Sequence, residues 1–166
     1  DHRYLHSFPT RRSSDLNFLQ IAEVKLVYVT KVKPSERPSI KTSKEAQRIL
    51  FESWAYDNIE HVETCKMLLL SRSNKVLGIT TISKGGVSGS LIDTKVIFQY
   101  ALKANACGVI IAHNHPSGNV APSESDLKIT RKIKEAGDIL DIQLLDHIIL
   151  TPEEDLYTSL ADEGHI

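Results

Sequence analysis

Residues 107–113, CGVIIAH, form a short run that is almost wholly apolar. A strand with one face in water alternates apolar and polar residues, whereas a run like this one fits a central strand buried on both faces. Segments typical of strands and of helices alternate along the chain, and one hairpin signal lies among them. We therefore predict a single mixed α/β (α+β) domain, in which helices flank a mixed β-sheet.

The other elements follow from apolar periodicity. Strands are predicted at residues 21–32, 63–70, 75–83 and 142–150, the second and third being joined by the turn SRSN. Helices are predicted at residues 42–55, 93–106 and 123–137. Thr42 or Ser43 and Asp93 are candidate N-caps of the first two helices, and Gly137 is a candidate terminator of the third.

The composition carries no strong charge bias. The 166 residues include 20 basic and 21 acidic side chains, and the formal net charge is -1. This balance argues against a strongly nucleic-acid-binding or membrane-surface domain, and no apolar stretch approaches the roughly 20 residues that span a bilayer. Cys65 and Cys107 lie in apolar, strand-like runs, which predicts buried free thiols in a reducing cytoplasm rather than a disulfide.

The first sixteen residues, DHRYLHSFPTRRSSDL, differ from all that follow. They have no apolar periodicity and lack the apolar region of a signal peptide. Residues 5–16 can be back-translated into a sequence that resembles a common short-read sequencing adapter. We therefore predict a non-native tail at residues 1–16, the alternative being a natural disordered tail, and a domain at residues 17–166. His2 and His6 are accordingly left out of any site.

Residues 84–90, KGGVSGS, form a glycine-rich stretch. Such a stretch can cradle phosphate, but this one lacks a Gly-Lys-Ser/Thr ending and the spacing of a dinucleotide-binding fingerprint. A flexible or close-approach loop is therefore the favoured interpretation.

Two histidines, His113 and His115, stand two residues apart where the apolar run ends. In an extended chain their side chains project to the same face, about 6.7 Å apart along the strand. Neutral imidazoles placed in this way can both reach one zinc ion at about 2.1 Å, while Asn114 points away. Pro116, Gly118 and Pro122 then predict a turn-rich loop that lets the chain return with a third ligand.

Ser123 and Asp126 stand at the start of the predicted third helix. Taken alone, the pair is best explained as a capping box, with Ser123 as N-cap and Asp126 near the third helical position. An aspartate in a first helical turn can also direct its carboxylate toward a metal. Two histidines and one aspartate would leave the fourth tetrahedral position of zinc to water, which is typical of catalytic rather than structural zinc sites.

The full pattern, His-x-His, seven residues, then Ser-x-x-Asp, resembles the JAMM (MPN+ or JAB) metalloprotease motif. AHNHPSG followed by PSESD is similar in particular to the RadC-like branch. The similarity extends through the stretches at residues 74–106, 141–150 and 157–164, and so covers essentially residues 17–166. It implies a JAB/MPN, cytidine-deaminase-like architecture. RadC proteins often carry an N-terminal helix-hairpin-helix region, and none is found here.

The resemblance implies that His113, His115 and Asp126 bind zinc. It further implies that Ser123 helps stabilise an oxyanion and that an upstream glutamate activates water. Glu63, which opens the strand at 63–70, matches that glutamate better than Glu60 does.

Three further histidines are not expected to be zinc ligands. His147 is expected to contact a ligand residue or to lie in the core, although a fourth ligand is conceivable. His61 and His165 belong to no motif and are expected at the surface.

The expected activity is zinc-dependent hydrolysis of a peptide or isopeptide bond, with a peptide or protein substrate. One alternative is a DNA-repair or nucleic-acid-processing factor, which would need a basic groove or an aromatic stacking platform. A second is a zinc-binding interaction module without activity. Nucleic-acid binding is expected to be weak.

Overall fold

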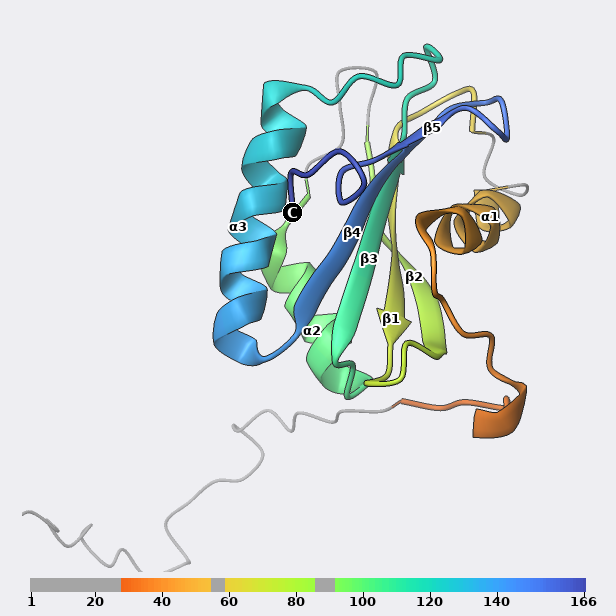
Figure 1. The fold of residues 1–166 in the computed structure, drawn as a ribbon, viewed down its shortest axis with the longest axis vertical. Helices are drawn as coiled ribbons and strands as arrows, with labels where there is room; N and C mark the ends of the chain where they lie inside the picture. The colour runs from red at the N-terminus through yellow and green to blue at the C-terminus, as the bar shows by residue number, and fades with distance from the viewer. Residues whose placement is uncertain (1–27, 55–58, 86–91) are drawn as a thin grey trace, which may run out of the picture.

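The computed structural model describes residues 28–54, 59–85 and 92–166, and a five-stranded sheet forms the centre of that part of the chain (Figure 1). The strands are β1 (Thr64–Leu70), β2 (Val76–Lys84), β3 (Gly108–Asn114), β4 (Gln143–Leu150) and β5 (Tyr157–Ser159). They lie in the order β2-β1-β3-β4-β5. β3 and β4 are parallel and the other neighbours are antiparallel. The predicted mixed sheet is confirmed.

Helices cover both faces of this sheet (Figure 1). α1 (Ser43–Trp54) packs on one face, and α2 (Thr94–Lys103) and α3 (Glu124–Leu140) pack on the other. A short 3-10 helix, η2 (Pro34–Glu36), precedes α1. The predicted α/β class, with helices flanking a mixed sheet, is thus confirmed.

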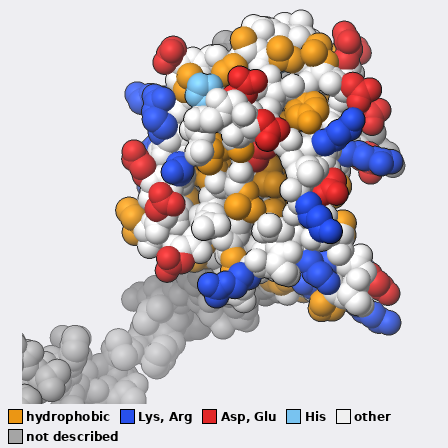
Figure 2. Space-filling view, viewed as in Figure 1, with side chains coloured by type: hydrophobic (Ala, Val, Ile, Leu, Met, Phe, Trp, Pro, Cys, Tyr) orange, Lys and Arg blue, Asp and Glu red, His pale blue; other side chains and the backbone are white. Residues whose placement is uncertain are grey.

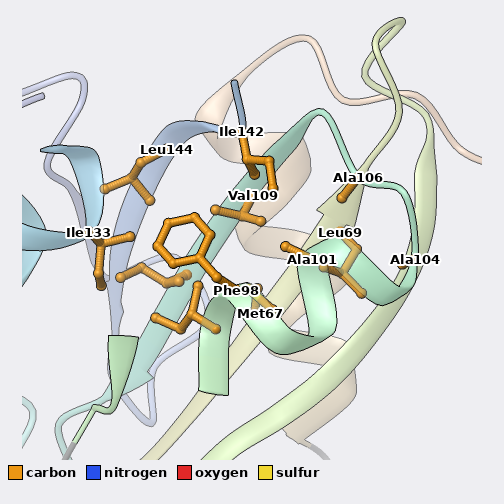
Figure 3. Packing of buried hydrophobic residues seen from close by; sticks show 12 residues of the cluster. Met67, Leu69, Phe98, Ala101, Ala104, Ala106, Val109, Ile133, Ile142 and Leu144 are labelled. Atoms are coloured by element: carbon orange, nitrogen blue, oxygen red, sulfur yellow. The ribbon is translucent and has the colours of Figure 1, made fainter. Parts of the chain in front are cut away.

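The predicted central strand is β3, and all seven of its residues are buried. Its side chains alternate between two hydrophobic clusters, as the period of two in a strand requires. Val109 and Ile111 pack with Phe98 of α2 and Ile133 of α3 (Figure 3). Ile110 and Ala112 pack on the other face, in the cluster that contains Leu50 and Trp54 of α1. Burying such large side chains stabilises the fold by about 1.5–3 kcal/mol each.

Three segments meet at one edge of the sheet. β3 ends there at Asn114, and the chain returns to begin α3 at Glu124, the helix that connects β3 to its parallel neighbour β4. β1 runs antiparallel to β3, and Cys65 pairs with His113. The start of β1 therefore lies beside the end of β3. Ligand sites of α/β folds are commonly found at such carboxyl ends of parallel strands.

The predicted strand at residues 21–32 is wrong where it can be checked. Residues 28–32 belong to no strand, and Tyr28 instead donates its hydroxyl to the Leu77 carbonyl at 2.6 Å. Residues 21–27 lie outside the described part of the chain, as do residues 1–16 and all but the first two residues of the glycine-rich stretch.

The third helix is longer than predicted, because Gly137 does not terminate it. α3 continues to Leu140, and Asp141 adopts the left-handed conformation (φ 55°) that ends the helix. The chain then folds back, and the Ile142 N–H donates to the Gly137 carbonyl at 2.9 Å. A Cβ on Gly137 would lie 2.3 Å from the Ile142 carbonyl oxygen, so the glycine serves this close approach.

The two cysteines are free thiols, but they differ in exposure. Cys65 is buried, as predicted, whereas Cys107, also predicted to be buried, is exposed directly before β3. Among the described residues, none of the helices has the length and apolar character needed to cross a bilayer.

Candidate metal centre

His113, His115 and Asp126 come together at the sheet edge, and their candidate ligand atoms all lie within 4.8 Å of one another. The two Nε2 atoms are 3.0 Å apart. His113 Nε2 is 3.4 Å from Asp126 Oδ1, and His115 Nε2 is 3.8 Å from Asp126 Oδ2. The spacing in the sequence thus predicted a group of residues that the fold does assemble.

His115 is held from two sides. Its backbone N–H donates to the Leu150 carbonyl at 2.8 Å, which ties it to the end of β4. Its ring Nδ1 lies 2.6 Å from the Asn119 carbonyl. A carbonyl can only accept, so Nδ1 carries a hydrogen, and Nε2 is the ring nitrogen that faces His113 and Asp126. The turn at Gly118 (φ 79°) brings Asn119 back to this position.

Asp126 belongs to the first turn of α3, and the capping box predicted for it is present. Its Oδ2 accepts from the Ser123 backbone N–H at 2.8 Å and from the Ser123 hydroxyl at 2.6 Å. Its backbone N–H donates in return to Ser123 Oγ at 3.1 Å. Oδ1 is the oxygen nearer to His113. One carboxylate therefore caps the helix and faces the two histidines.

The carboxylate of Asp126 is ionised. Burial alone would raise its pKa, but the contact with His113 and the hydrogen bonds from Ser123 outweigh burial and hold the pKa well below its usual range. The Nε2 atoms of both histidines and this ionised carboxylate converge on one point, which favours a proton or a cation there. Two imidazole nitrogens and one carboxylate oxygen are a donor set that zinc accepts, so these residues fit zinc.

Glu63 precedes β1 at the same sheet edge and is half-buried. Its backbone carbonyl accepts from the Gly85 N–H at 2.8 Å. It stands two residues before Cys65, the register partner of His113, so its backbone lies beside the end of β3. Glu60 is exposed in the preceding turn, and His61 and His165 are exposed as expected.

Asn114 is the residue that sequence reasoning missed. It is fully buried on the side away from its neighbouring histidines, and its amide makes four hydrogen bonds. Its Oδ1 accepts from the Thr64 N–H at 2.7 Å and the Trp54 indole N–H at 3.2 Å. Its Nδ2 donates to the carbonyls of Ile59 and Val62 at 2.7 and 3.0 Å. Asn114 thus fixes the segment that carries Glu63 to the strand that carries the histidines. The signal that could have identified this residue is its position in the sequence, between His113 and His115.

His147 of β4 lies behind His113, as expected of a histidine that contacts a ligand residue. Its Nε2 is 2.8 Å from His113 Nδ1, the ring nitrogen that faces away from Asp126, and its Nδ1 is 2.6 Å from Thr130 Oγ1. Complete burial, followed by the charge of His113, holds the pKa of His147 well below its ordinary value, so the ring is neutral.

The sequence has counterparts among known proteins. The family model for the RadC-like JAB domain matches residues 40–165, which include all the residues of the site. A UPF0758 protein of Flavobacterium johnsoniae is 48% identical over 98 residues, which are 59% of this chain and 42% of that protein.

Two other relatives match over more of the chain. A UPF0758 protein of Desulfitobacterium hafniense is 36% identical over 131 residues, 79% of this chain and 56% of that protein. A UPF0758 protein of Desulforudis audaxviator is 36% identical over 133 residues, 80% of this chain and 56% of that protein. The chain thus spans about half the length of these relatives. With the family model matched from β1 through β5 and the motif residues assembled at one sheet edge, the chain belongs to the RadC-like JAB domain family.

Proposed function

We propose that this domain is a zinc-dependent hydrolase that cleaves an amide bond, in a peptide or as an isopeptide link, in a protein or peptide substrate. The observation that carries the proposal is the convergence of His113, His115 and Asp126 at the carboxyl end of β3. Three protein ligands leave one tetrahedral position open, the arrangement typical of catalytic zinc. Membership of the JAB family is consistent with this chemistry.

Zinc bound here would lower the pKa of a water molecule toward 7 and polarise a carbonyl. In the proposed reaction, Glu63 takes a proton from the attacking water and passes it to the leaving amine. The hydrogen bonds of Asn114 to both sides of Glu63, at Val62 and Thr64, support this role because they fix the backbone from which the carboxylate extends.

Ser123 is the proposed oxyanion donor. Its hydroxyl donates to Asp126 Oδ2 at 2.6 Å, so donation to a substrate requires the hydroxyl hydrogen to turn away from the carboxylate. The Ser123 N–H continues to donate to Oδ2 at 2.8 Å and keeps the helix capped meanwhile. Removal of one such oxyanion donor costs roughly 3 kcal/mol in other enzymes.

The two alternative functions, nucleic-acid processing and zinc binding without activity, are not supported by a comparable grouping of residues. On the face shown in Figure 2, basic side chains are interspersed with acidic ones rather than gathered into a stripe that could follow a nucleic-acid backbone. A zinc-binding module without activity would need the metal ligands, and Ser123 to hold Asp126, but it would not need Glu63. Since Cys65 and Cys107 are both free thiols, we also propose the reducing cytoplasm as the location.

The test is hydrolysis by the zinc-loaded protein of peptide and isopeptide libraries, with DNA substrates in parallel. Glu63→Gln keeps the size of the side chain but cannot act as a base. We expect this variant to bind zinc as the parent does and to lose activity by about a hundredfold or more.

Glu60→Gln is the matched control, because Glu60 is exposed three residues earlier, and it should hydrolyse as the parent does. Loss of zinc in Glu63→Gln would make Glu63 a ligand instead of a base. Full activity in Glu63→Gln would contradict the mechanism, and cleavage of DNA alone would contradict the proposed function.

A further inference from the structure

A chain of buried hydrogen bonds runs behind the candidate metal centre, through two residues to which the proposed function gives no role. It begins at the backbone carbonyl of Asp126, which lies 2.6 Å from Thr130 Oγ1. Thr130 Oγ1 lies 2.6 Å from His147 Nδ1, and His147 Nε2 lies 2.8 Å from His113 Nδ1. Thr130 is 1% exposed and His147 is 0% exposed, so water does not compete for these groups.

The direction of every bond in this chain is set at its Asp126 end. A carbonyl can only accept, and a hydroxyl has one hydrogen, so the Thr130 hydroxyl donates to the Asp126 carbonyl. Two oxygens 2.6 Å apart with no hydrogen between them would repel each other, which excludes the opposite arrangement. Thr130 Oγ1 must therefore accept from His147, whose Nδ1 carries the hydrogen.

The same reasoning continues to the ligand. The neutral ring of His147 has one N–H, and this is used at Nδ1, so its Nε2 is an acceptor. His113 must then donate from its own Nδ1, so Nε2 is the nitrogen of this ring that is left to bind a cation. That Nε2 is the atom 3.0 Å from His115 Nε2 and 3.4 Å from Asp126 Oδ1.

We propose that Thr130 and His147 are positioning residues that fix His113 as its Nδ1–H tautomer and so present its Nε2 lone pair to a cation. The proposal rests on the ligand set of the proposed function, but not on any hydrolytic step. It also links two ligands, because the chain that orients His113 begins at the backbone of Asp126. Partners of this kind fix the orientation of ligand imidazoles in metal sites generally.

The tautomers can be observed directly in the metal-free protein. Long-range 1H–15N spectra of the ¹⁵N-labelled chain, recorded at a pH where imidazoles are neutral, distinguish a protonated from an unprotonated ring nitrogen. We expect Nδ1–H on both His113 and His147, although neutral imidazole in water prefers the Nε2–H form. An Nδ1 without its hydrogen on either ring would overturn the proposal.

Zinc affinity, measured by competition with a chelator, is the second readout. Thr130→Val keeps the shape of the side chain and removes the hydroxyl, and we expect zinc to bind about 10- to 100-fold more weakly. Thr130→Ser restores the hydroxyl and should restore the affinity. Thr151→Val is the control, because Thr151 is also 1% exposed and bonded to backbone carbonyls, but it lies outside this chain of bonds.

The proposal would be overturned if Thr130→Val bound zinc as tightly as the parent does. It would also be overturned if Thr130→Val and Thr151→Val lost equal amounts of zinc affinity. Should Thr130→Val fail to fold, the tautomers of the parent still decide. A failure of the proposed function would give a different result. If the tautomers and zinc affinities are as expected but no hydrolysis occurs, only the proposed hydrolase activity is contradicted.

Discussion

The two thiols of this protein have opposite environments. Burial raises the pKa of Cys65 to about 12, while Cys107 is exposed directly before β3. A thiol reacts as its thiolate, so a raised pKa and the lack of access both protect Cys65.

We therefore predict that one thiol per chain reacts with a disulfide reagent near pH 8 in the native protein, and that both react after denaturation. Cys107→Ser should abolish the native reaction. Rapid native labelling of two thiols would show that Cys65 is accessible, against the packing of β1 described above.

Asn114 is the second residue with a distinctive environment, since its amide satisfies four buried groups. Asn114→Ala leaves all four without their partner. Each unsatisfied buried group costs about 1–3 kcal/mol, so the loss in the free energy of unfolding should be about 3 kcal/mol or more.

Urea denaturation measures this loss. Gln99→Ala, which removes an exposed amide from α2, is the control and should change stability by less than about 0.5 kcal/mol. Equal effects of the two substitutions would mean that the Asn114 amide does not join α1, β1 and β3.

Among the elements, the C-terminal end of α3 depends most on a single position. Gly137→Ala places a methyl group 2.3 Å from the Ile142 carbonyl oxygen, a backbone atom that cannot move without shifting β4. Alanine favours a helix by up to about 1 kcal/mol over glycine, but overpacking of a closed site costs about 1–3 kcal/mol. We therefore expect the clash to outweigh the gain in helix propensity, so that Gly137→Ala destabilises the protein.

Thermal unfolding should show a lower melting temperature for Gly137→Ala. Gly78→Ala is the matched control, because nothing lies within 4 Å of a Cβ there, and it should be neutral or slightly stabilising. An increase in the melting temperature of Gly137→Ala would mean that the Ile142 carbonyl does not approach Gly137 this closely.

At the scale of the whole molecule, local patterns were enough for strands β1 to β4 and for the grouping of His113, His115 and Asp126, whereas β5 was not predicted. The apolar run 107–113 and the hairpin signal depend on nearest neighbours, and so does the His-x-His spacing. Residues whose role is set by distant partners could not be predicted. Asn114 bonds to residues 50 to 60 positions earlier, and Thr130 meets His147 across 17 positions.

The predicted ends of two elements were wrong for a related reason. Gly137 carries the usual signal of a helix terminus, yet α3 gains one more turn because Asp141 accepts the left-handed conformation and Ile142 packs into the core. The apolar run also predicted a buried Cys107, but β3 begins one residue later, at Gly108, and Cys107 is exposed.

The near balance of charge predicts weak, nonspecific binding to nucleic acid. A salt titration of binding to duplex DNA checks this, and we expect a dissociation constant above about 1 μM at physiological salt. Tighter binding with a steep salt dependence would support a nucleic-acid-processing role instead.

The metal content of the purified protein tests the central claim most directly. We predict about one zinc per chain, removed by His113→Ala and by Asp126→Ala, because each substitution takes away one of only three protein ligands. His61→Ala, at an exposed histidine outside the site, should keep its zinc. Two imidazoles and a carboxylate can also hold iron(II), so iron is measured in the same samples. Iron in place of zinc in the parent, or stoichiometric zinc in both site variants, would contradict the account.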